Sequence, residues 1–402
     1  MGRFVQDNAR WLATGLLLAF GSSFGQTYFI ALFAGEIRAA HGLSNGDWGL
    51  LYTLATLGSA LLLLGWGSLA DTVPFSRLVP VITGLYACAA LAMALGQSVW
   101  VLGLAVFLLR FCGQGMFGHI AATAMGRWFV ATRGRAVAIK GLGYPLGEVS
   151  LPLLYVGLIA WIGWRQAWGV TAAVILFGLL PLLMGLLARD RVPKGQTGTT
   201  GSPGLGGRHW TRGAALGHWL FPALVPLMLT PGFIGTVVFF HQVHVAEVKG
   251  WTLAQMAAGY PVYAVVTVIS ALVAGQAVDR FGVTQLLPLL VVPMGAAMFL
   301  IGPASAPWHW AAALGVLGLS QGMVGTFWGA FLPAIYGTDN LGAIWSLVVA
   351  LLVISTAIGP GITGLVIDWG VSFPRQGVAM GLWCLILAAG MLPVRAKLLD
   401  TR

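Results

Sequence analysis

Gly275-Gln-Ala-Val-Asp279 repeats the pattern of Gly67-Ser-Leu-Ala-Asp71, which lies 208 positions earlier in the chain. Gln321-Gly-Met-Val-Gly325 repeats Gln114-Gly-Met-Phe-Gly118 at a spacing of 207. Two further pairs lie 207 and 210 positions apart, namely Gly157-Leu-Ile with Gly364-Leu-Val and Arg165-Gln166 with Arg375-Gln376. Four matches at nearly one spacing indicate two halves of common design. Such a duplication is typical of proteins whose two bundles rock against each other around a central site.

The composition shows which solvent surrounds these halves. Charged residues make up 8% of the 402 residues, against about 25% in soluble proteins, and hydrophobic residues make up 58%. The mean hydropathy is +0.88. Because so few charges cannot solvate a surface of this size in water, we expect lipid to surround most of the chain. The composition excludes an ordinary soluble enzyme, a secreted disulfide scaffold and a disordered protein.

Apolar runs bounded by charges, Gly, Pro or Trp predict twelve membrane-spanning helices. The predicted ranges are 11–35, 48–69, 78–97, 101–126, 136–161, 166–188, 216–245, 252–277, 284–303, 308–335, 341–367 and 376–395. The polar, Gly-rich stretch 189–213 predicts a flexible linker. The predicted fold is therefore an all-α membrane protein, with one six-helix bundle over 1–188 and a pseudo-symmetric second bundle over 214–402.

The distribution of basic residues predicts how the chain is oriented. Twelve crossings place both termini on one side, and 16 of the 21 Lys and Arg residues lie on that side. Four lie on the opposite side, and Arg110 lies inside a span. The positive-inside rule therefore predicts cytoplasmic termini and a cytoplasmic linker, in an inner membrane. The same rule accounts for the net charge of +10 without a nucleic-acid partner.

The repeated loops resemble those of the major facilitator superfamily. Gly275-x-x-x-Asp279-Arg280-x-Gly282 is similar to the family's loop between the second and third helices of a half, and Gly67-x-x-x-Asp71 is the first-half version. The resemblance implies the twelve-helix fold and transport by alternating access. Asp71, Asp279 and Arg280, at cytoplasmic helix ends, are interpreted as a conformational lock.

Two motifs of the first half extend this resemblance. Leu109-Arg110-x-x-Gly113-Gln114-Gly115 is similar to the family's arginine motif in span 4. Arg127-Trp-Phe, with Arg133-Gly-Arg135, resembles the following loop in the monocarboxylate and oxalate/formate-like branch. That branch implies an organic anion, such as a monocarboxylate, as substrate.

Arg110 and Glu148 are the charges that the sequence places deepest in the predicted spans. A charge at mid-membrane costs at least about 2.5–3.5 kcal/mol on insertion scales, so each needs a partner or a water-filled cavity. At about 1.5 Å per residue the two lie within roughly one helical turn in depth, so they could pair. Their counterparts in the second half are Leu317 and Ser355, which are uncharged. We hypothesise that Glu148 is the proton-coupling acid and that Arg110 holds it or a substrate carboxylate; the alternative is a buried bridge that only orients two helices.

Other polar or aromatic residues of the spans are candidates for substrate binding or coupling. They are Gln26, Phe29, Gln114, Tyr144, His241, His244, Gln321 and Ser355. His241 and His244 share a helix face at a spacing of three, which favours gating or anion attraction, or else hydrogen bonds to loop groups. No third ligand accompanies them, so no metal site and no cofactor is predicted. For Gln and Tyr, helix–helix hydrogen bonding is an equal alternative.

The sequence predicts a monomeric secondary transporter that moves a small solute, an organic anion, with proton coupling. No nucleophile triad and no paired carboxylates for hydrolysis are present, so an enzyme is not expected. If Glu148 neutralises Arg110, proton-driven efflux of neutral or amphiphilic compounds becomes the alternative. A non-transporting sensor built on the same fold is the alternative from another class.

Overall fold

The computed structural model describes residues 2–129, 132–188 and 203–400, which form helices and no strand. The chain divides into two compact units, Met1–Gly198 and Thr199–Arg402. The boundary between them falls within 189–202, outside the described residues. The ends of the linker, set at 189 and 213 from the sequence, stay a prediction.

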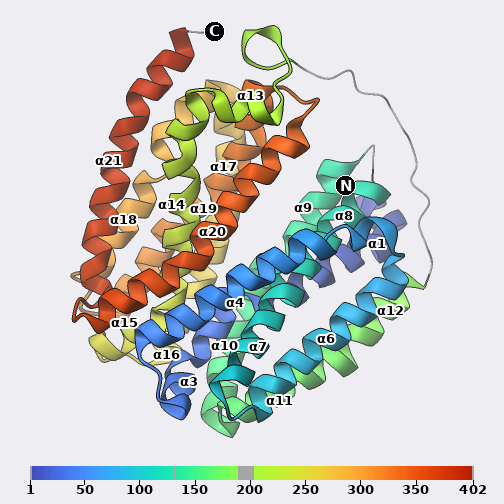
Figure 1. Cartoon of the computed structure of the whole chain (residues 1–402), viewed down its shortest axis with the longest axis vertical. Coiled ribbons are helices and arrows are strands. Elements are labelled where there is room, and N and C mark those ends of the chain that lie inside the picture. The colour runs from blue at the N-terminus through green and yellow to red at the C-terminus, as the bar shows by residue number, and fades with distance from the viewer. Residues whose placement is uncertain (1, 130–131, 189–202, 401–402) are drawn as a thin grey trace. The chain divides into compact units, whose positions relative to one another are not determined.

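The first unit is built from twelve α-helices joined by short 3-10 and π-helical segments (Figure 1). The α-helices are α1 (Gly2–Gly21), α2 (Thr27–Ile30), α3 (Ala34–His41), α4 (Asn45–Trp66), α5 (Leu69–Thr72), α6 (Phe75–Leu95), α7 (Val99–Leu109), α8 (Gly118–Trp128), α9 (Arg133–Gly141), α10 (Gly143–Ile162), α11 (Trp164–Ala173) and α12 (Leu180–Leu187). The 3-10 segments are η1 (Ser22–Gly25) and η2 (Ala31–Phe33), and the π-helical segments are η3 (Arg110–Phe117) and η4 (Val174–Leu179).

The second unit contains nine α-helices among its described residues. They are α13 (Arg212–Gly217), α14 (Leu220–Phe240), α15 (Gln242–Lys249), α16 (Leu253–Ala257), α17 (Gly259–Phe281), α18 (Val292–Ile301), α19 (Pro307–Tyr336), α20 (Leu341–Asp368) and α21 (Phe373–Asp400). The 3-10 segments are η5 (Leu205–Gly207) and η6 (Val283–Leu289).

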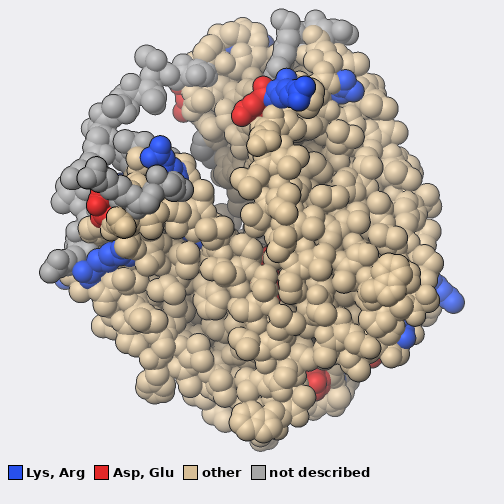
Figure 2. All heavy atoms as spheres, turned by 180° about the vertical axis from the view of Figure 1, so that it is seen from behind, with Lys and Arg blue, Asp and Glu red and all other residues tan. Residues whose placement is uncertain are grey.

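The helices have the length and composition of membrane spans. Among the described residues, eleven are long and apolar enough to cross a membrane, and the bent pair Phe4–Gly25 and Thr27–His41 raises the number to twelve. Leu64, Trp100 and Phe177 are 80%, 90% and 77% exposed, as side chains that face lipid are. In the face shown in Figure 2 the charged side chains gather toward the ends of the spans, with an uncharged surface between them. These observations confirm the predicted membrane fold.

The first span differs from the single helix predicted over 11–35. It bends by 42° at Gln26, whose backbone is extended with φ −81° and ψ 153°. The hydroxyl of Tyr86 donates to the carbonyls of Gly21 and Ser22 at 3.2 and 3.4 Å. Groups from other helices therefore bind backbone carbonyls at the break, which the local sequence pattern could not indicate. The helix predicted over 216–245 is likewise interrupted, at Gly217–Leu220 and at His241.

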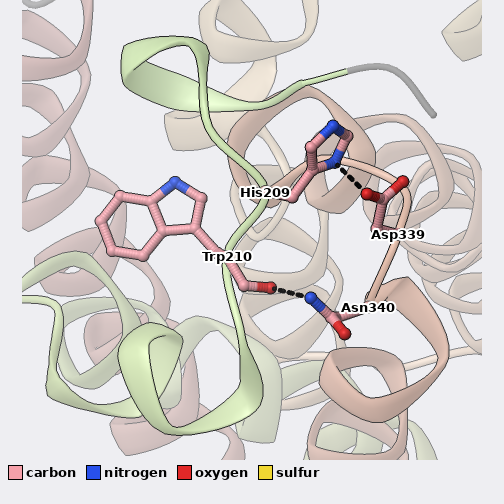
Figure 3. Close-up of polar contacts among 4 residues, drawn as sticks. All are labelled: His209, Trp210, Asp339 and Asn340. Atoms are coloured by element: carbon pink, nitrogen blue, oxygen red, sulfur yellow. Dashed lines mark hydrogen bonds and ion pairs between the residues drawn. The ribbon is translucent and has the colours of Figure 1, made fainter.

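The end of the predicted flexible linker is held against the second unit by a segment that we call the strap, residues 203–211. Trp210 N donates to the carbonyl of Tyr336 at 3.0 Å, and Asn340 Nδ2 donates to the carbonyl of Trp210 at 3.1 Å. His209 Nδ1 lies 3.4 Å from a carboxylate oxygen of Asp339 (Figure 3). The strap is therefore joined to α19 and to the residues that follow it by these contacts, and the prediction of a flexible linker stays a prediction; residues 189–202 lie outside the described residues.

Candidate functional site

Arg110 lies at the centre of the first unit, at the point where α7 passes into the π-helical segment η3. Its side chain is 1% exposed. Nη1 donates to the carbonyl oxygen of Gly25 at 3.1 Å and to Oγ1 of Thr27 at 3.4 Å. Both acceptors flank the break in the first span. The π-helical turn, a feature that is frequent at functional sites, places this arginine against the break.

The wall around Arg110 is aromatic. The centroid of the Tyr52 ring lies 5.1 Å from its guanidinium carbon, which is a cation–π distance. The Tyr52 hydroxyl lies 2.7 Å from Oγ1 of Thr27, so the ring is fixed in place. The Tyr52 ring therefore gives the positive charge of Arg110 a polarisable surface, but the ring carries no negative charge that would neutralise it.

Two of the three guanidinium nitrogens of Arg110 lack a partner. Nε and Nη2 are buried and form no hydrogen bond with any described residue. Glu148 does not supply one, since the described residues include no ion pair between Arg110 and Glu148. A buried, always-charged group with open donors is costly in a membrane, and a planar guanidinium suits a carboxylate in bidentate geometry. Of the two arrangements that the sequence left open, the described residues therefore do not show the pair of Arg110 with Glu148, and Nε and Nη2 of Arg110 remain without a described partner.

The rise per residue, which suggested that the two side chains could pair, does not determine the direction in which each points. Depth follows from the rise per residue, but side-chain direction depends on rotation about the helix axis. Segment η3 has a wider turn than an α-helix and begins at Arg110, so its side chain turns toward the break in the first span.

Close packing between η1 and η3 holds the break in place. A Cβ atom on Gly25 would overlap the carbonyl oxygen of Leu109 and lie 2.9 Å from Cα of Gly113. A Cβ on Gly113 would overlap the Tyr86 hydroxyl and lie 2.8 Å from Cα of Gly25. Two glycines that face each other thus let the backbones approach, as in close helix contacts in membranes.

Glu148 lies on α10, beside the same break but on another side of it. Its side chain is half-buried. The preceding Gly147 packs so closely on η1 that a Cβ there would overlap Oγ of Ser23. Glu148 forms no hydrogen bond or ion pair with a described residue. The first span is therefore approached by η3 through Arg110 and by α10 through Gly147, the residue before Glu148.

The other candidates of the first unit have separate surroundings. Phe29 is fully buried in an aromatic cluster, 4.7 Å from the ring of Tyr155 and 5.4 Å from that of Trp168. Gln26 is half-buried at the bend itself, and Gln114 is half-buried on η3. The half-buried Tyr144 lies on α10 with Nζ of Lys140 4.8 Å from its ring centroid. Phe29 packs as a core residue, and the remaining roles stay predictions.

In the second unit, His241 forms a buried polar link between α14 and α20. It is 2% exposed, and its Nε2 lies 2.6 Å from Oγ1 of Thr363. Gln376 Nε2 donates to the carbonyl oxygens of Thr363 and Val371 at 3.1 and 2.9 Å. His244 follows on α15 and is half-buried. This chain of contacts joins α14, α20 and α21 within the unit.

Gln321 and Ser355 contact α14 at Pro231 and Gly232. Gln321 Nε2 donates to the carbonyl of Pro231 at 3.1 Å. Ser355 is 1% exposed, donates to the carbonyl of Leu352 at 2.9 Å, and would be overlapped by a Cβ on Gly232. Gln321 therefore has the helix-linking contact that was the alternative to substrate binding.

The residues predicted as a conformational lock lie at helix ends. Asp279 and Arg280 are exposed at the end of α17, and the Arg280 guanidinium lies 5.2 Å from the ring of Phe281. Neither forms an ion pair with a described residue. The backbone of Asp71 lies in α5, and its side chain lies outside the described part of the structure. The lock stays a prediction.

Comparison with known proteins gives one family. The sequence profile of the Major Facilitator Superfamily matches residues 15–360. The chain belongs to the Major Facilitator Superfamily. The fold is also similar to a bacterial homologue of the human lysosomal transporter Spinster in its inward-facing, unoccupied conformation, with a TM-score of 0.70, 16% identity and 98% of each chain covered.

A second similar fold is that of the nucleoside transporter NupG, with a TM-score of 0.70 and 11% identity over 95% of this chain and 98% of that one. No curated protein sequence gives a match. At these identities the similarity to solved structures shows the fold alone. The family nevertheless makes this chain a membrane transporter and not an enzyme; the monocarboxylate and oxalate/formate-like branch stays a proposal.

In this major facilitator, the sequence did not indicate several residues that contact Arg110 or join His241. Thr27 and Tyr52 contact Arg110, and Thr363 and Gln376 join His241. Each is an uncharged residue whose partner lies on another helix, so spacing along the chain gives no signal. Gln376 was visible only as the repeat counterpart of Gln166.

A loop attachment in the first half was also missed. His119 Nε2 lies 3.0 Å from the carbonyl of Gly67, and Arg127 Nη1 donates to the carbonyl of Ala70 at 2.9 Å. Helix α8 therefore holds the Gly67–Asp71 loop through backbone carbonyls. His119 thus has a definite polar partner in this loop.

Proposed function

We propose that this major facilitator is a secondary active transporter that moves a small organic anion, such as a monocarboxylate, by alternating access coupled to protons. The observation that carries the proposal is the open guanidinium of Arg110, whose Nε and Nη2 are buried without a partner among the described residues. A buried cation without a partner is energetically unfavourable in a membrane, and a ligand that neutralises it best explains its presence. A carboxylate matches the two open donors in charge and in planar geometry.

Glu148 is proposed as the group that carries the proton. It is half-buried and forms no ion pair with a described residue, so its charge is not fixed by a permanent partner. A carboxyl group in such surroundings changes its affinity for protons when solvent or a charge approaches. Opening and closing of the transporter would change both. Proton uptake at Glu148 would then accompany anion binding at Arg110.

The proposal includes the orientation derived from the basic residues. The termini lie on the cytoplasmic side of an inner membrane, and the transporter works as a monomer. Asp71, Asp279 and Arg280 are proposed to stabilise one of its conformations from the cytoplasmic helix ends.

The experiment that tests the proposal is flux into proteoliposomes. The purified full chain is reconstituted, and uptake of a panel of labelled short-chain carboxylates is measured with and without a pH gradient. We expect uptake of at least one carboxylate, stimulated by the gradient, and we expect Glu148→Gln to remove the stimulation. Glu148→Gln with full pH dependence would remove the proton assignment, and flux of neutral solutes in preference to carboxylates would overturn the anion assignment.

A further inference from the structure

The second unit holds a cavity of about 730 Å³ between α14, α20 and α21. This volume lies within the range of roughly 300–1,000 Å³ that is typical of small-molecule sites. All of its lining residues are described and belong to the second unit, so the cavity does not depend on how the two units are placed. Arg110 is not among the lining residues.

The walls of this cavity are apolar in character. Eleven of its 16 lining residues are hydrophobic or proline, including Phe233, Ile362 and Met380. The uncharged polar members are engaged with the protein: Thr230 accepts from Trp383 Nε1 at 3.0 Å and donates to the carbonyl of Pro226, and Thr363 is held by His241. A ligand therefore meets mainly hydrocarbon, which favours an apolar chain or ring system.

The single charge at the cavity is Arg375. No other residue of its fully described lining is ionisable, and Arg375 is exposed on the first turn of α21. Its guanidinium forms no hydrogen bond or ion pair with a described residue. Five donors of a permanent cation are thus available at the edge of an apolar cavity.

The cavity is elongated, and Arg375 lies at one end of it. The lining residues of α20 run from Ser355 to Val366, which spans about 16 Å at 1.5 Å per residue. Helices α20 and α21 are joined by a short turn, so Arg375 lies near the Val366 end. Trp383, two helical turns further along α21, is hydrogen-bonded to Thr230 at the other end.

We propose that this cavity is a binding site for a long-chain carboxylate, with the carboxylate on Arg375 and the alkyl chain running along α20 toward Trp383. The elongated apolar walls accept the chain, and the cation at one end orients it. Because each buried methylene group adds to the binding free energy, a chain that fills the cavity binds more tightly than a short carboxylate. The site is independent of the proposed transport of small anions at Arg110.

Photo-labelling tests the site in the full chain reconstituted in lipid nanodiscs. The probe is a fatty acid with a diazirine near its methyl end, and adducts are located by peptide mass spectrometry. We expect adducts near Trp383 and on the facing part of α14. An excess of unlabelled fatty acid should suppress them, whereas the alcohol of the same chain length should not. Adducts spread evenly over lipid-facing residues of all helices would overturn the proposal.

Matched variants separate the site from general partition into lipid. Ala379→Trp fills the cavity, whereas Ala389→Trp adds the same ring to an exposed position of α21 that does not line it. We expect Ala379→Trp to abolish labelling at Trp383 and Ala389→Trp to leave it unchanged. Arg375→Gln should weaken apparent affinity at least about tenfold, since hydrogen bonds to charged groups contribute about 1.5–3 kcal/mol.

A neutral variant of the other centre distinguishes this inference from the proposed function. Arg110→Gln should leave the labelling at Trp383 intact even where small-anion uptake is lost. Loss of labelling in Arg110→Gln, or equal labelling in Arg375→Gln and the wild type, would contradict a site centred on Arg375. A phosphate-headed single-chain lipid that competes better than the fatty acid would replace the carboxylate by a phosphate as the ligand's head.

Discussion

Arg110 Nη1 donates to the carbonyl oxygen of Gly25 at 3.1 Å, so a cation of the fourth span is bonded to the break of the first. The break leaves this carbonyl without its usual helical donor, because the amide of Phe29 donates to Gln26 instead. Arg110 therefore binds the backbone through Nη1, whereas its Nε and Nη2 form no hydrogen bond with a described residue. If the proposed anion binds to these two nitrogens, Arg110 links the shape of the first span to the presence of the anion.

The first prediction separates the contact of Arg110 with the backbone from its proposed contact with an anion. Arg110→Gln keeps a donor for the Gly25 carbonyl and removes a charge that is costly in the membrane. We expect anion uptake in proteoliposomes to fall at least about tenfold, because charged hydrogen bonds contribute about 1.5–3 kcal/mol. The Tm in a thermal-shift assay should stay equal or rise. Arg110→Lys should keep partial uptake.

Arg165 offers a matched control for this prediction. It also donates to backbone carbonyls, those of Ala94 and Gly96, but lies at the beginning of α11. Arg165→Gln should lower the Tm and leave the choice among carboxylates unchanged. A large loss of Tm in Arg110→Gln with normal uptake would instead assign Arg110 a purely structural role.

The second prediction concerns the glycine contact behind the break. Gly113→Ala would place a methyl group against the Tyr86 hydroxyl and the backbone of Gly25, so we expect destabilisation by about 1–3 kcal/mol. Gly115→Ala, on the same segment, meets nothing closer than Leu63 at 3.5 Å and should be tolerated. Thermal unfolding of both variants checks this difference. Equal Tm values would mean that η1 and η3 accommodate the added methyl group without a loss of stability.

Part of this arrangement could be predicted from the sequence alone. The repeat and the spans follow from the local sequence pattern. The choice of Arg110 as the central cation follows from the rarity of charged residues within a span. The break at Gln26 could not be predicted, since it depends on Tyr86 and Gly113 from other helices. Tertiary contacts overrode the helical pattern of 11–35.

The missed cavity of the second unit has the same cause. Its lining residues come from α14, α20, α21 and the turn between the last two, and apart from Arg375 none of them is unusual for a membrane helix when taken alone. Arg375 is visible in the sequence only as a loop-end basic residue and as the counterpart of Arg165. Its position at the edge of an apolar cavity is a property of how three helices pack.

The third prediction uses the two glutamines that the repeat makes equivalent. Gln321 donates to the carbonyl of Pro231, whereas Gln114 forms no hydrogen bond with a described residue. Gln321→Leu should therefore lower stability by about 1 kcal/mol, the net contribution of one hydrogen bond. Gln114→Leu should leave the Tm unchanged and reduce anion uptake. The opposite assignment, with a Tm loss only in Gln114→Leu, would contradict the roles inferred for both.

The fourth prediction concerns the acid response of the strap. The pKa of His218 is held below its usual range, first by partial burial and then by the positive charges of Arg208 and Lys397. Its ring lies beside that of Trp210 in the strap, at 4.6 Å between centroids and tilted by 52°. A histidine with a lowered pKa takes up a proton more readily once the strap detaches. The docked strap should therefore lose stability as pH falls below about 6.5, the ordinary histidine value.

Hydrogen exchange of the Trp210 amide, corrected for its intrinsic pH dependence, reports docking through the bond to Tyr336. Between pH 7.5 and 5.5 we expect protection to fall in the wild type and to fall less in His218→Asn. His309→Asn, at the far end of α19, is the control and should follow the wild type. One common profile for all three proteins would show that His218 does not sense acid through the strap.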